Sequence, residues 1–267
     1  MISQRRRLCK ALAVLIALAP LLPTRVVTQG SRRLVVAAAS DLQTVLPEIV
    51  RGFERSRAAT VTVSYGSSGT LFAQIQNGAP FDVFLSADVD YPRQLATAGF
   101  ADAATLQVYA KGHLVLWARR DSHLDLGRGL VALTDARVRF VALANPKYAP
   151  YGRAAVAALR NAQLYDTLEK KLVMGESLAQ TAQLVESGNA DAGLLSLSLV
   201  LGPTLKAEGS YAEIPATSYP DIDQAAVVVK ASREAALARD FIAYLRQGPS
   251  VEHLTRFGFT VLRPSAR

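Results

Sequence analysis

The sequence predicts an α/β protein with two lobes, each a mostly parallel sheet flanked by helices. Apolar runs such as Leu34–Ala39 are typical of strands buried on both faces. Each run is followed by apolar residues at helix spacing, and this alternation indicates parallel strands joined by helices. Ligands of such sheets bind beyond the carboxyl ends of the strands. Four of those ends carry hydroxyls or exposed amides, two early and two late in the chain, which suggests two lobes around one cleft.

The first strand-to-helix corner is predicted at Ser40, directly after the first apolar run. Apolar residues then recur at helix spacing, but Pro47 fits a helix only in its first turn. The regular helix is therefore expected to begin near Thr44, after a tighter turn at 40–43. Asp41 is well placed to cap this helix, and its side chain is expected to point outward.

The second corner lies in the stretch 64–71. Residues 60–65 alternate as in a strand, and apolar residues at helix spacing follow until Asn77-Gly78 stops the helix. The motif Gly66-Ser67-Ser68-Gly69 therefore sits where a strand passes into a helix. Free backbone N–H groups and the positive end of the helix dipole meet there, and two hydroxyls complete a neutral anion cradle. The alternative is a serine cap on an ordinary loop.

Two equivalent corners are predicted in the second half of the chain. A strand at 138–144 leads through Pro150-Tyr151-Gly152 into an alanine-rich helix at 154–160. Ser177-Leu178-Ala179-Gln180 fits the capping-box pattern and opens another helix, which Gly188 ends. Tyr151 and Leu178 are thus predicted at helix starts, as Ser68 is.

The rest of the chain continues the alternation. Asp88 is expected to be a structural helix cap, because aspartate before a helix is usually a cap. Ser196 and Ser198 alternate with leucines and are placed in one strand. Further strands are predicted at 81–86, 114–117, 194–199 and 225–229.

Composition excludes one class of partner. The chain has 267 residues, of which 50% are hydrophobic, enough for a sizeable core. Its formal net charge is +8, but residues 1–30 hold five basic residues and no acidic residue. The remaining positive charge is small and scattered, so no nucleic-acid partner is expected.

Residues 1–30 read as an export signal, with a basic start and an apolar run at 11–22 that is too short to span a membrane. Arg5-Arg6-Arg7 loosely resembles a twin-arginine signal, although an ordinary secretion signal is preferred. Cys9 precedes the apolar run, so it cannot be a lipid-anchor cysteine at a cleavage site. We expect a cleaved, soluble periplasmic protein without a lipid anchor. A cytosolic protein with an apolar first helix is the alternative.

Several motifs are specific in their order and spacing. They are Ala37-Ala38-Ala39-Ser40, Gly66-Ser67-Ser68-Gly69-Thr70-Leu71, Gln74-Ile75-Gln76-Asn77-Gly78-Ala79-Pro80, Asp82-Val83-Phe84-Leu85-Ser86-Ala87-Asp88, Pro150-Tyr151-Gly152 and Arg256-Phe257-Gly258-Phe259. Together they resemble one family, the periplasmic molybdate-binding proteins of ABC importers, which have the type II periplasmic binding protein fold. The resemblance covers nearly everything after residue 33.

The resemblance implies a molybdate site. Ser40 and Ser68 would bind oxyanion oxygens through hydroxyl and backbone N–H, and the backbone N–H groups of Tyr151 and Leu178 would close the cage. Some members place a tyrosine ligand where this chain has Ser196, whose shorter side chain is a doubtful substitute. The Tyr151 hydroxyl is the other candidate for that bond. Molybdenum would be present only inside the oxyanion, and tungstate, of nearly equal size and charge, should bind similarly.

The expected organisation and partners follow from the same family. Residues 31–111 and 223–267 are expected to form one lobe and 112–222 the other, with hinges near Lys111-Gly112 and Pro220–Asp223. Only the closed form would present both lobes to the membrane permease and its ATPase. A monomer without a cofactor is expected.

Other functions remain open at this point. The nearest is a protein of the same fold that binds sulfate, phosphate or a small organic acid. A serine hydrolase would need a base, and His113, His123 and His253 lie in no recognisable motif, so we expect no enzyme. A transcription regulator would need a DNA-binding helix pair, and a metal-cation site would need clustered ligands. Neither pattern is apparent.

Overall fold

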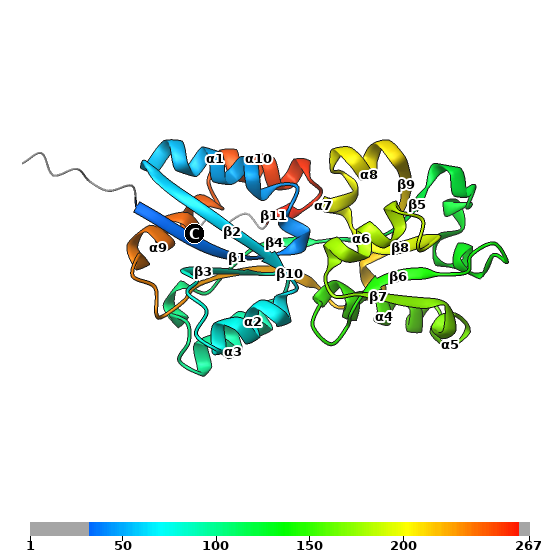
Figure 1. Cartoon of the computed structure of the whole chain (residues 1–267), viewed down its shortest axis with the longest axis horizontal. Coiled ribbons are helices and arrows are strands. Elements are labelled where there is room, and N and C mark those ends of the chain that lie inside the picture. The colour runs from blue at the N-terminus through cyan, green and yellow to red at the C-terminus, as the bar shows by residue number, and fades with distance from the viewer. Residues whose placement is uncertain (1–31, 262–267) are drawn as a thin grey trace, which may run out of the picture. The chain divides into compact units, whose positions relative to one another are not determined.

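The computed structural model describes residues 32–261, which form two β-sheets with helices on their faces (Figure 1). The predicted export signal at 1–30 lies outside the described residues. Within 32–261, no helix is both long and apolar enough to cross a membrane.

The first sheet contains strands from both ends of the described chain. They are β1 (Arg32–Ala39), β2 (Ala59–Gly66), β3 (Val83–Ser86), β4 (Gln107–Gly112), β10 (Ile222–Val228) and β11 (Thr260–Val261). Their order in the sheet is β11-β4-β10-β3-β1-β2. β1 lies parallel to β2 and β3, whereas β10 runs antiparallel to β3 and β4, and β11 runs antiparallel to β4.

The second sheet comes entirely from the middle of the chain. Its strands are β5 (Leu114–Arg119), β6 (Val141–Ala144), β7 (Leu172–Gly175), β8 (Ala192–Ser196) and β9 (Gly209–Glu213). They lie in the order β7-β6-β8-β5-β9. β6 is parallel to β7 and β8, while β5 is antiparallel to β8 and β9.

Each sheet is therefore mixed, and the prediction of mostly parallel sheets was wrong in this respect. The strands that lead into the four predicted corners, β1, β2, β6 and β7, do lie in parallel pairs. Strand direction depends on the end of the sheet at which the chain enters. β4 and β5 are separated by one residue and belong to different sheets. The chain thus crosses from one sheet to the other at this point, and no local residue pattern predicts the crossing.

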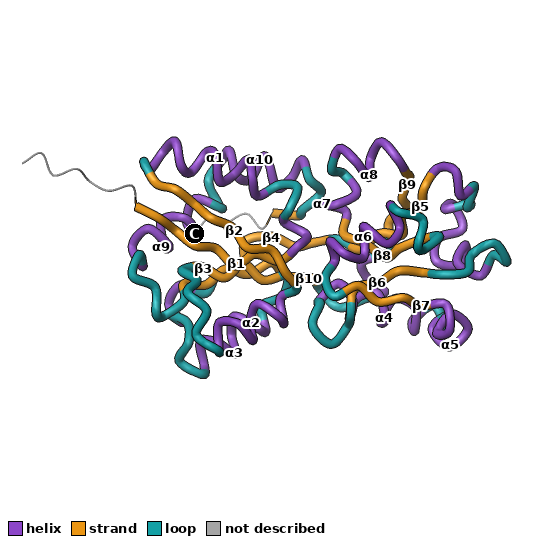
Figure 2. Tube along the Cα trace, viewed as in Figure 1, coloured by secondary structure: helices purple, strands orange, loops and turns teal. Residues whose placement is uncertain are grey.

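Helices cover both faces of each sheet (Figure 2). On the first sheet α1 and α10 lie on one face and α2 and α3 on the other (Figure 1). The helices are α1 (Leu46–Arg57), α2 (Ser68–Gln76), α3 (Asp90–Thr97), α4 (Pro150–Asn161), α5 (Tyr165–Leu168), α6 (Leu178–Glu186), α7 (Leu197–Val200), α8 (Pro203–Glu208), α9 (Ala235–Tyr244) and α10 (Gly248–Arg256). Packing of their apolar faces forms the core. For example, the Phe53 and Phe241 rings pack edge to face, with their centroids 5.0 Å apart.

The chain passes between the sheets twice. β4 ends at Gly112 and β5 begins at Leu114, and β9 ends at Glu213 before β10 begins at Ile222. These positions lie close to the two predicted hinges. The lobe boundaries themselves, 31–111, 112–222 and 223–267, stay a prediction.

Two local predictions had opposite outcomes. Ser40–Leu42 forms a short 3-10 helix, and Pro47 occupies the first turn of α1, as expected. The strand predicted at 194–199 was wrong in its second half, because it ends at Ser196 and α7 follows. The Ser196 hydroxyl accepts a hydrogen bond from Leu199 N–H at 3.3 Å, and this cap favours a helix over the alternating pattern.

Candidate functional site

The four predicted corners meet around one cavity. Ser40 follows β1, Ser68 is the first residue of α2, Tyr151 is the second residue of α4 and Leu178 is the first of α6. All four line the cavity, and each is at most 4% exposed. The other lining residues are Ala39, Asp41, Gly66, Ser67, Ala87, Ala149 and Pro150. The structure thus brings together residues that are separated by more than a hundred positions in the sequence.

Helix starts supply the polar character of this cavity. The first N–H groups of a helix have no partner within the helix, and they carry the positive end of its dipole. α2, α4 and α6 all begin here, and the Ser67 and Ser177 side chains cap two of them by accepting from Thr70 N–H and Gln180 N–H. No lysine, arginine or histidine is among the lining residues. The cavity therefore offers neutral donors, which suit a small anion.

Ser68 is oriented as a donor. Its Oγ accepts a hydrogen bond from Ala87 N–H at 3.0 Å. A hydroxyl that accepts in this way keeps its own proton for another acceptor. Ser68 can therefore offer an O–H as well as its backbone N–H to a bound anion.

Ser40 differs from the role that the family resemblance implies for it. Its hydroxyl donates to the Gly66 carbonyl oxygen at 2.8 Å, which joins the ends of β1 and β2. The single hydroxyl proton is used in that bond. In this arrangement Ser40 offers an anion its backbone N–H and not its hydroxyl.

Neither candidate for the additional hydroxyl is placed as the sequence suggested. Ser196 is not among the lining residues; it is fully buried and caps α7, and its Oγ lies 3.0 Å from the Ser198 hydroxyl oxygen. The Tyr151 hydroxyl lies beside Gly112, where an added Cβ would be only 2.1 Å from it. It also faces the Asp41 carboxyl, without a hydrogen-bond partner among the described residues.

Asp41 does not point outward, so that expectation was wrong. It is 1% exposed, makes no helix cap, and its Oδ2 accepts from Gln224 Nε2 at 2.8 Å. Burial raises the pKa of Asp41 to about 7, against smaller opposing effects of Tyr151 and Gln224. Sequence reasoning missed Gln224; the one available signal was an amide directly before the apolar run of β10.

Elements of the two sheets contact each other around the cavity. Gly69 N–H donates to the Tyr148 carbonyl oxygen at 2.8 Å, and Arg153 forms an ion pair with Asp88. On the other side, the Ser198 hydroxyl donates to the Asp41 carbonyl oxygen at 2.7 Å. Asp88 also accepts from Tyr91 N–H at 3.0 Å, in line with its expected structural role. The cavity is therefore enclosed by direct contacts between the two halves.

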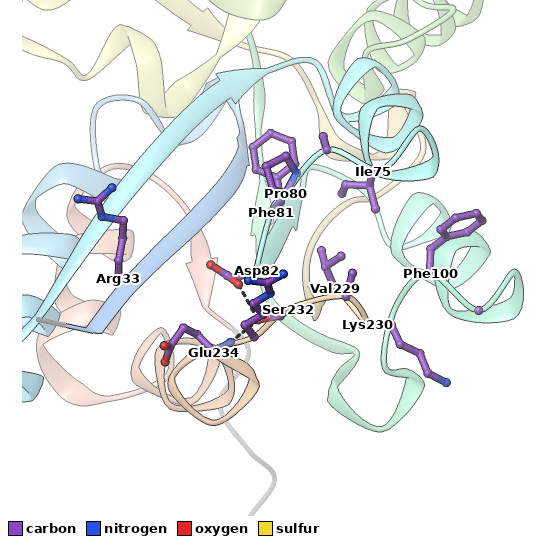
Figure 3. Close-up of a pocket in the computed structure, with 15 residues that line it drawn as sticks. Arg33, Ile75, Pro80, Phe81, Asp82, Phe100, Val229, Lys230, Ser232 and Glu234 are labelled. Carbon is purple, nitrogen blue, oxygen red and sulfur yellow. Dashed lines mark hydrogen bonds between the residues drawn. The ribbon is translucent and has the colours of Figure 1, made fainter. Parts of the chain in front are cut away.

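A larger cavity of about 730 Å³ lies at the opposite end of the first sheet (Figure 3). It borders the starts of β1 and β3 and the N-terminus of α9, away from the N-termini of α2, α4 and α6. Asp82 is its central carboxylate, and both oxygens are occupied, by Val35 N–H at 2.7 Å and by the Ser232 hydroxyl at 2.6 Å. Arg33 and Lys230 extend on opposite sides of Asp82 in this view.

The described residues form neither a metal-ion site nor a serine–histidine pair at the smaller cavity. No group of three or more histidine, cysteine, aspartate or glutamate side chains is positioned to hold a metal ion within the described part of the chain. His113 bonds Thr260, and His253 contacts Glu48. Neither of them lines the cavity, nor does His123, so no imidazole is placed to act as a base for its serines.

Comparison with known proteins gives a consistent result. A family model described as bacterial extracellular solute-binding protein matches residues 34–260. The molybdate-binding protein ModA of Rhodobacter capsulatus is 36% identical over 84% of this chain and 87% of its own length. ModA of Azotobacter vinelandii is 36% identical over 84% of this chain and 88% of its own length.

Solved structures support the fold. The periplasmic molybdate-binding protein of Azotobacter vinelandii superposes with a TM-score of 0.80 at 33% identity, covering 86% of this chain and all of that one. The substrate-binding domain of a putative molybdenum ABC transporter from Clostridium difficile gives 0.66 at 27% identity, with coverage of 87% and 100%. The sulfate-binding protein SubI of Mycobacterium tuberculosis gives 0.70 at 14% identity, covering 88% of each chain, and shows the shared fold alone. The predicted periplasmic binding protein fold is confirmed.

Proposed function

Because this chain belongs to the bacterial extracellular solute-binding protein family, we propose that it binds molybdate, and tungstate equally well, for delivery to an ABC permease. The observation that carries the proposal is the convergence of Ser40, Ser68, Tyr151 and Leu178 on one cavity of neutral donors. Two relatives that are 36% identical are named as molybdate-binding proteins. No catalytic role is proposed.

The donors of the cavity would supply free energy of the magnitude that binding needs. Hydrogen bonds to a charged group contribute roughly 1.5–3 kcal/mol each. Four backbone N–H groups and the Ser68 hydroxyl would therefore contribute roughly 8–15 kcal/mol before costs. Micromolar affinity needs about 8 kcal/mol. The Ser40 hydroxyl bond, which is missing from this total, would have added roughly 1.5–3 kcal/mol.

Binding requires the two halves to separate and close again. The lining residues Ser40, Ser68, Tyr151 and Leu178 are at most 4% exposed, so no ion reaches them from solvent in this arrangement. The cavity is about 10 Å³, close to the minimum for a single water molecule. A tetrahedral oxyanion needs more room. Hinge movement at the two crossings would admit the ion and then enclose it with donors from both sides.

The same movement would signal the loaded state. Only a closed form holds the surfaces of both halves in one arrangement, which a membrane permease can distinguish from the open form. In this role the mature protein acts in the periplasm as a monomer, after removal of the export signal. One relative of 28% identity is named as a putative ABC transporter substrate-binding lipoprotein, which agrees with an ABC importer as partner.

Calorimetric titration of the purified mature protein tests the proposal. Molybdate and tungstate should bind with similar, micromolar or better affinity, and sulfate, phosphate and chromate at least about tenfold more weakly, which corresponds to about 1.4 kcal/mol. A preference for sulfate or phosphate would assign the cavity to another oxyanion. If none of these ions gave a heat of binding, that result would contradict an oxyanion-binding function.

A further inference from the structure

A buried polar cluster borders the oxyanion cavity, and the proposed binding mechanism uses none of its side chains. We define the Asp41 cluster as Asp41, Tyr109, Tyr151 and Gln224, which are each at most 3% exposed. Asp41 follows β1, Tyr109 lies in β4 and Gln224 in β10, all on the first sheet, while Tyr151 comes from α4 on the second. The cluster therefore spans the junction between the two halves.

Most polar atoms of this cluster lack partners. Asp41 Oδ2 accepts from Gln224 Nε2 at 2.8 Å. Among the described residues, Asp41 Oδ1, Gln224 Oε1 and the hydroxyls of Tyr109 and Tyr151 have no hydrogen bond of regular geometry, although the Tyr151 hydroxyl lies close enough to the Asp41 carboxyl to lower its pKa. Buried polar groups are normally paired, so this concentration of unpaired atoms calls for a chemical explanation.

The groups that face the Asp41 carboxyl are neutral. They are Tyr109 from β4, Tyr151 from α4 and Gln224 from β10, with Tyr219 behind Tyr151. No lysine, arginine or histidine of the described chain is its hydrogen-bond partner or ion-pair partner. A buried carboxylate without a cation is strongly disfavoured, and such a group usually becomes neutral instead.

The position of Asp41 further favours its neutral form. It follows Ser40 directly and lines the same cavity that would hold the oxyanion. A dianion enclosed beside an ionised carboxylate would meet a like charge in a medium with little screening. The donors of the cavity carry no net positive charge, so they cannot cancel this repulsion.

We propose that Asp41 binds a proton from solvent when the cleft closes on the oxyanion, so that the protein captures the oxyanion and one proton together. This inference rests on the proposed oxyanion-binding function. The proton converts the carboxylate into a neutral carboxyl whose O–H can donate to the adjacent Tyr151 hydroxyl oxygen. The added proton thus removes the like charge and supplies a donor among unpaired acceptors.

The titration behaviour of the cluster is consistent with this assignment. Burial raises the pKa of Asp41 from its ordinary 3.8 to about 7, and burial also raises the pKa values of Tyr109 and Tyr151 well above 10. Both tyrosines therefore stay neutral, and Asp41 is the group that titrates. An open cleft returns the Asp41 carboxyl to water, where its pKa falls. Closing therefore takes up a proton at pH values between the pKa of Asp41 in the open form and its pKa in the closed form.

Calorimetry with sodium molybdate tests the proposal. Titrations from about pH 5.5 to about pH 8.5, each in two buffers of different ionisation enthalpy, measure affinity and proton uptake together. For the wild-type protein we expect uptake approaching one proton per ion below about pH 7, with the dissociation constant rising by up to about tenfold per pH unit. Uptake should decline at higher pH, where Asp41 stays ionised in both forms.

Two variants identify the proton site. Asp41→Asn keeps the size and removes the charge, so it should bind molybdate with no proton uptake and a nearly constant dissociation constant, and more tightly than wild type at high pH. Asp90→Asn is the matched control, because its carboxylate is 69% exposed on α3; it should retain the wild-type slope. Protonation of molybdate itself would affect all three proteins equally.

The outcomes separate the two proposals. A wild-type protein that binds molybdate without proton uptake, or an Asp41→Asn variant that keeps the wild-type slope, would overturn the proton site and leave oxyanion binding intact. Absence of binding by the wild type would overturn both. The uptake measurement on wild type needs no variant, so misfolding of Asp41→Asn does not prevent the decision.

Discussion

Gly69 N–H donates a hydrogen bond to the Tyr148 carbonyl oxygen at 2.8 Å, and this bond joins the start of α2 to the turn after β6. The approach is possible because residue 69 has no side chain. A Cβ at this position would lie 2.8 Å from that oxygen, 2.9 Å from Tyr148 Cα and 2.6 Å from the Tyr91 hydroxyl. Two of these atoms belong to the backbone, which cannot move aside as a flexible side chain can.

Gly69→Ala should therefore prevent the closed arrangement. We expect molybdate affinity to fall at least about tenfold, equivalent to about 1.4 kcal/mol. Thermal stability of the ligand-free protein should be unchanged or higher, because alanine favours a helix by up to about 1 kcal/mol over glycine. Titration calorimetry and thermal denaturation measure the two effects. Gly248→Ala is the control, because an added Cβ at that helix start meets nothing within 4 Å; equal affinities of the two variants would contradict the prediction.

The two serines of the cavity should respond differently to alanine. Ser68→Ala removes an O–H donor to the ion and should cost about 1–3 kcal/mol of molybdate binding. Ser40→Ala removes the bond to the Gly66 carbonyl oxygen, so it should lower the free energy of unfolding by about 1 kcal/mol and change binding less. Calorimetry and urea denaturation of both variants decide this. A larger binding loss in Ser40→Ala than in Ser68→Ala would show that the Ser40 hydroxyl turns to the ion.

The remaining hydroxyls can be compared in the same way. Tyr151→Phe should keep molybdate affinity within about threefold at neutral pH, because its hydroxyl faces Asp41 and Gly112. It should also move the pH dependence of binding to higher pH, since the Tyr151 hydroxyl lowers the pKa of Asp41. Ser196→Ala removes a helix cap and should cost about 0.5–2 kcal/mol of stability with little change in affinity. A loss of more than about 1 kcal/mol of binding in Tyr151→Phe would assign that hydroxyl to the ion.

With molybdate bound and the cleft closed, stability should depend on pH through Asp41. Burial raises the pKa of Asp41 from 3.8 to about 7, so the folded state binds the proton more tightly than the unfolded chain. The free energy of unfolding should therefore fall as pH rises from about 4 to about 7 and level off above, by at most about 4 kcal/mol, since one pKa unit is about 1.4 kcal/mol. Urea denaturation of wild type and Asp41→Asn in saturating molybdate at several pH values measures the difference. Parallel curves for the two proteins would contradict the prediction.

The sequence alone located the candidate site. The positions of Ser40, Ser68, Tyr151 and Leu178 at strand-to-helix corners follow from strand and helix periodicity, from capping residues and from the glycines between them. These are local signals, because they depend on residues within a few positions of each other. Pro47 in the first turn of α1 is an example in which a single residue determined the helix start.

Only the tertiary structure decided how each polar side chain is used. The Ser40 hydroxyl donates to Gly66, the Ser196 hydroxyl caps α7, and Asp41 is buried against Gln224, which lies 183 positions later in the sequence. The mixed strand directions have the same origin, since they depend on the route of the chain between sheets. A hydroxyl or carboxyl forms hydrogen bonds with the groups that packing brings near it. Here those groups come from segments far away in the sequence, and the local residue pattern does not indicate which segments they are.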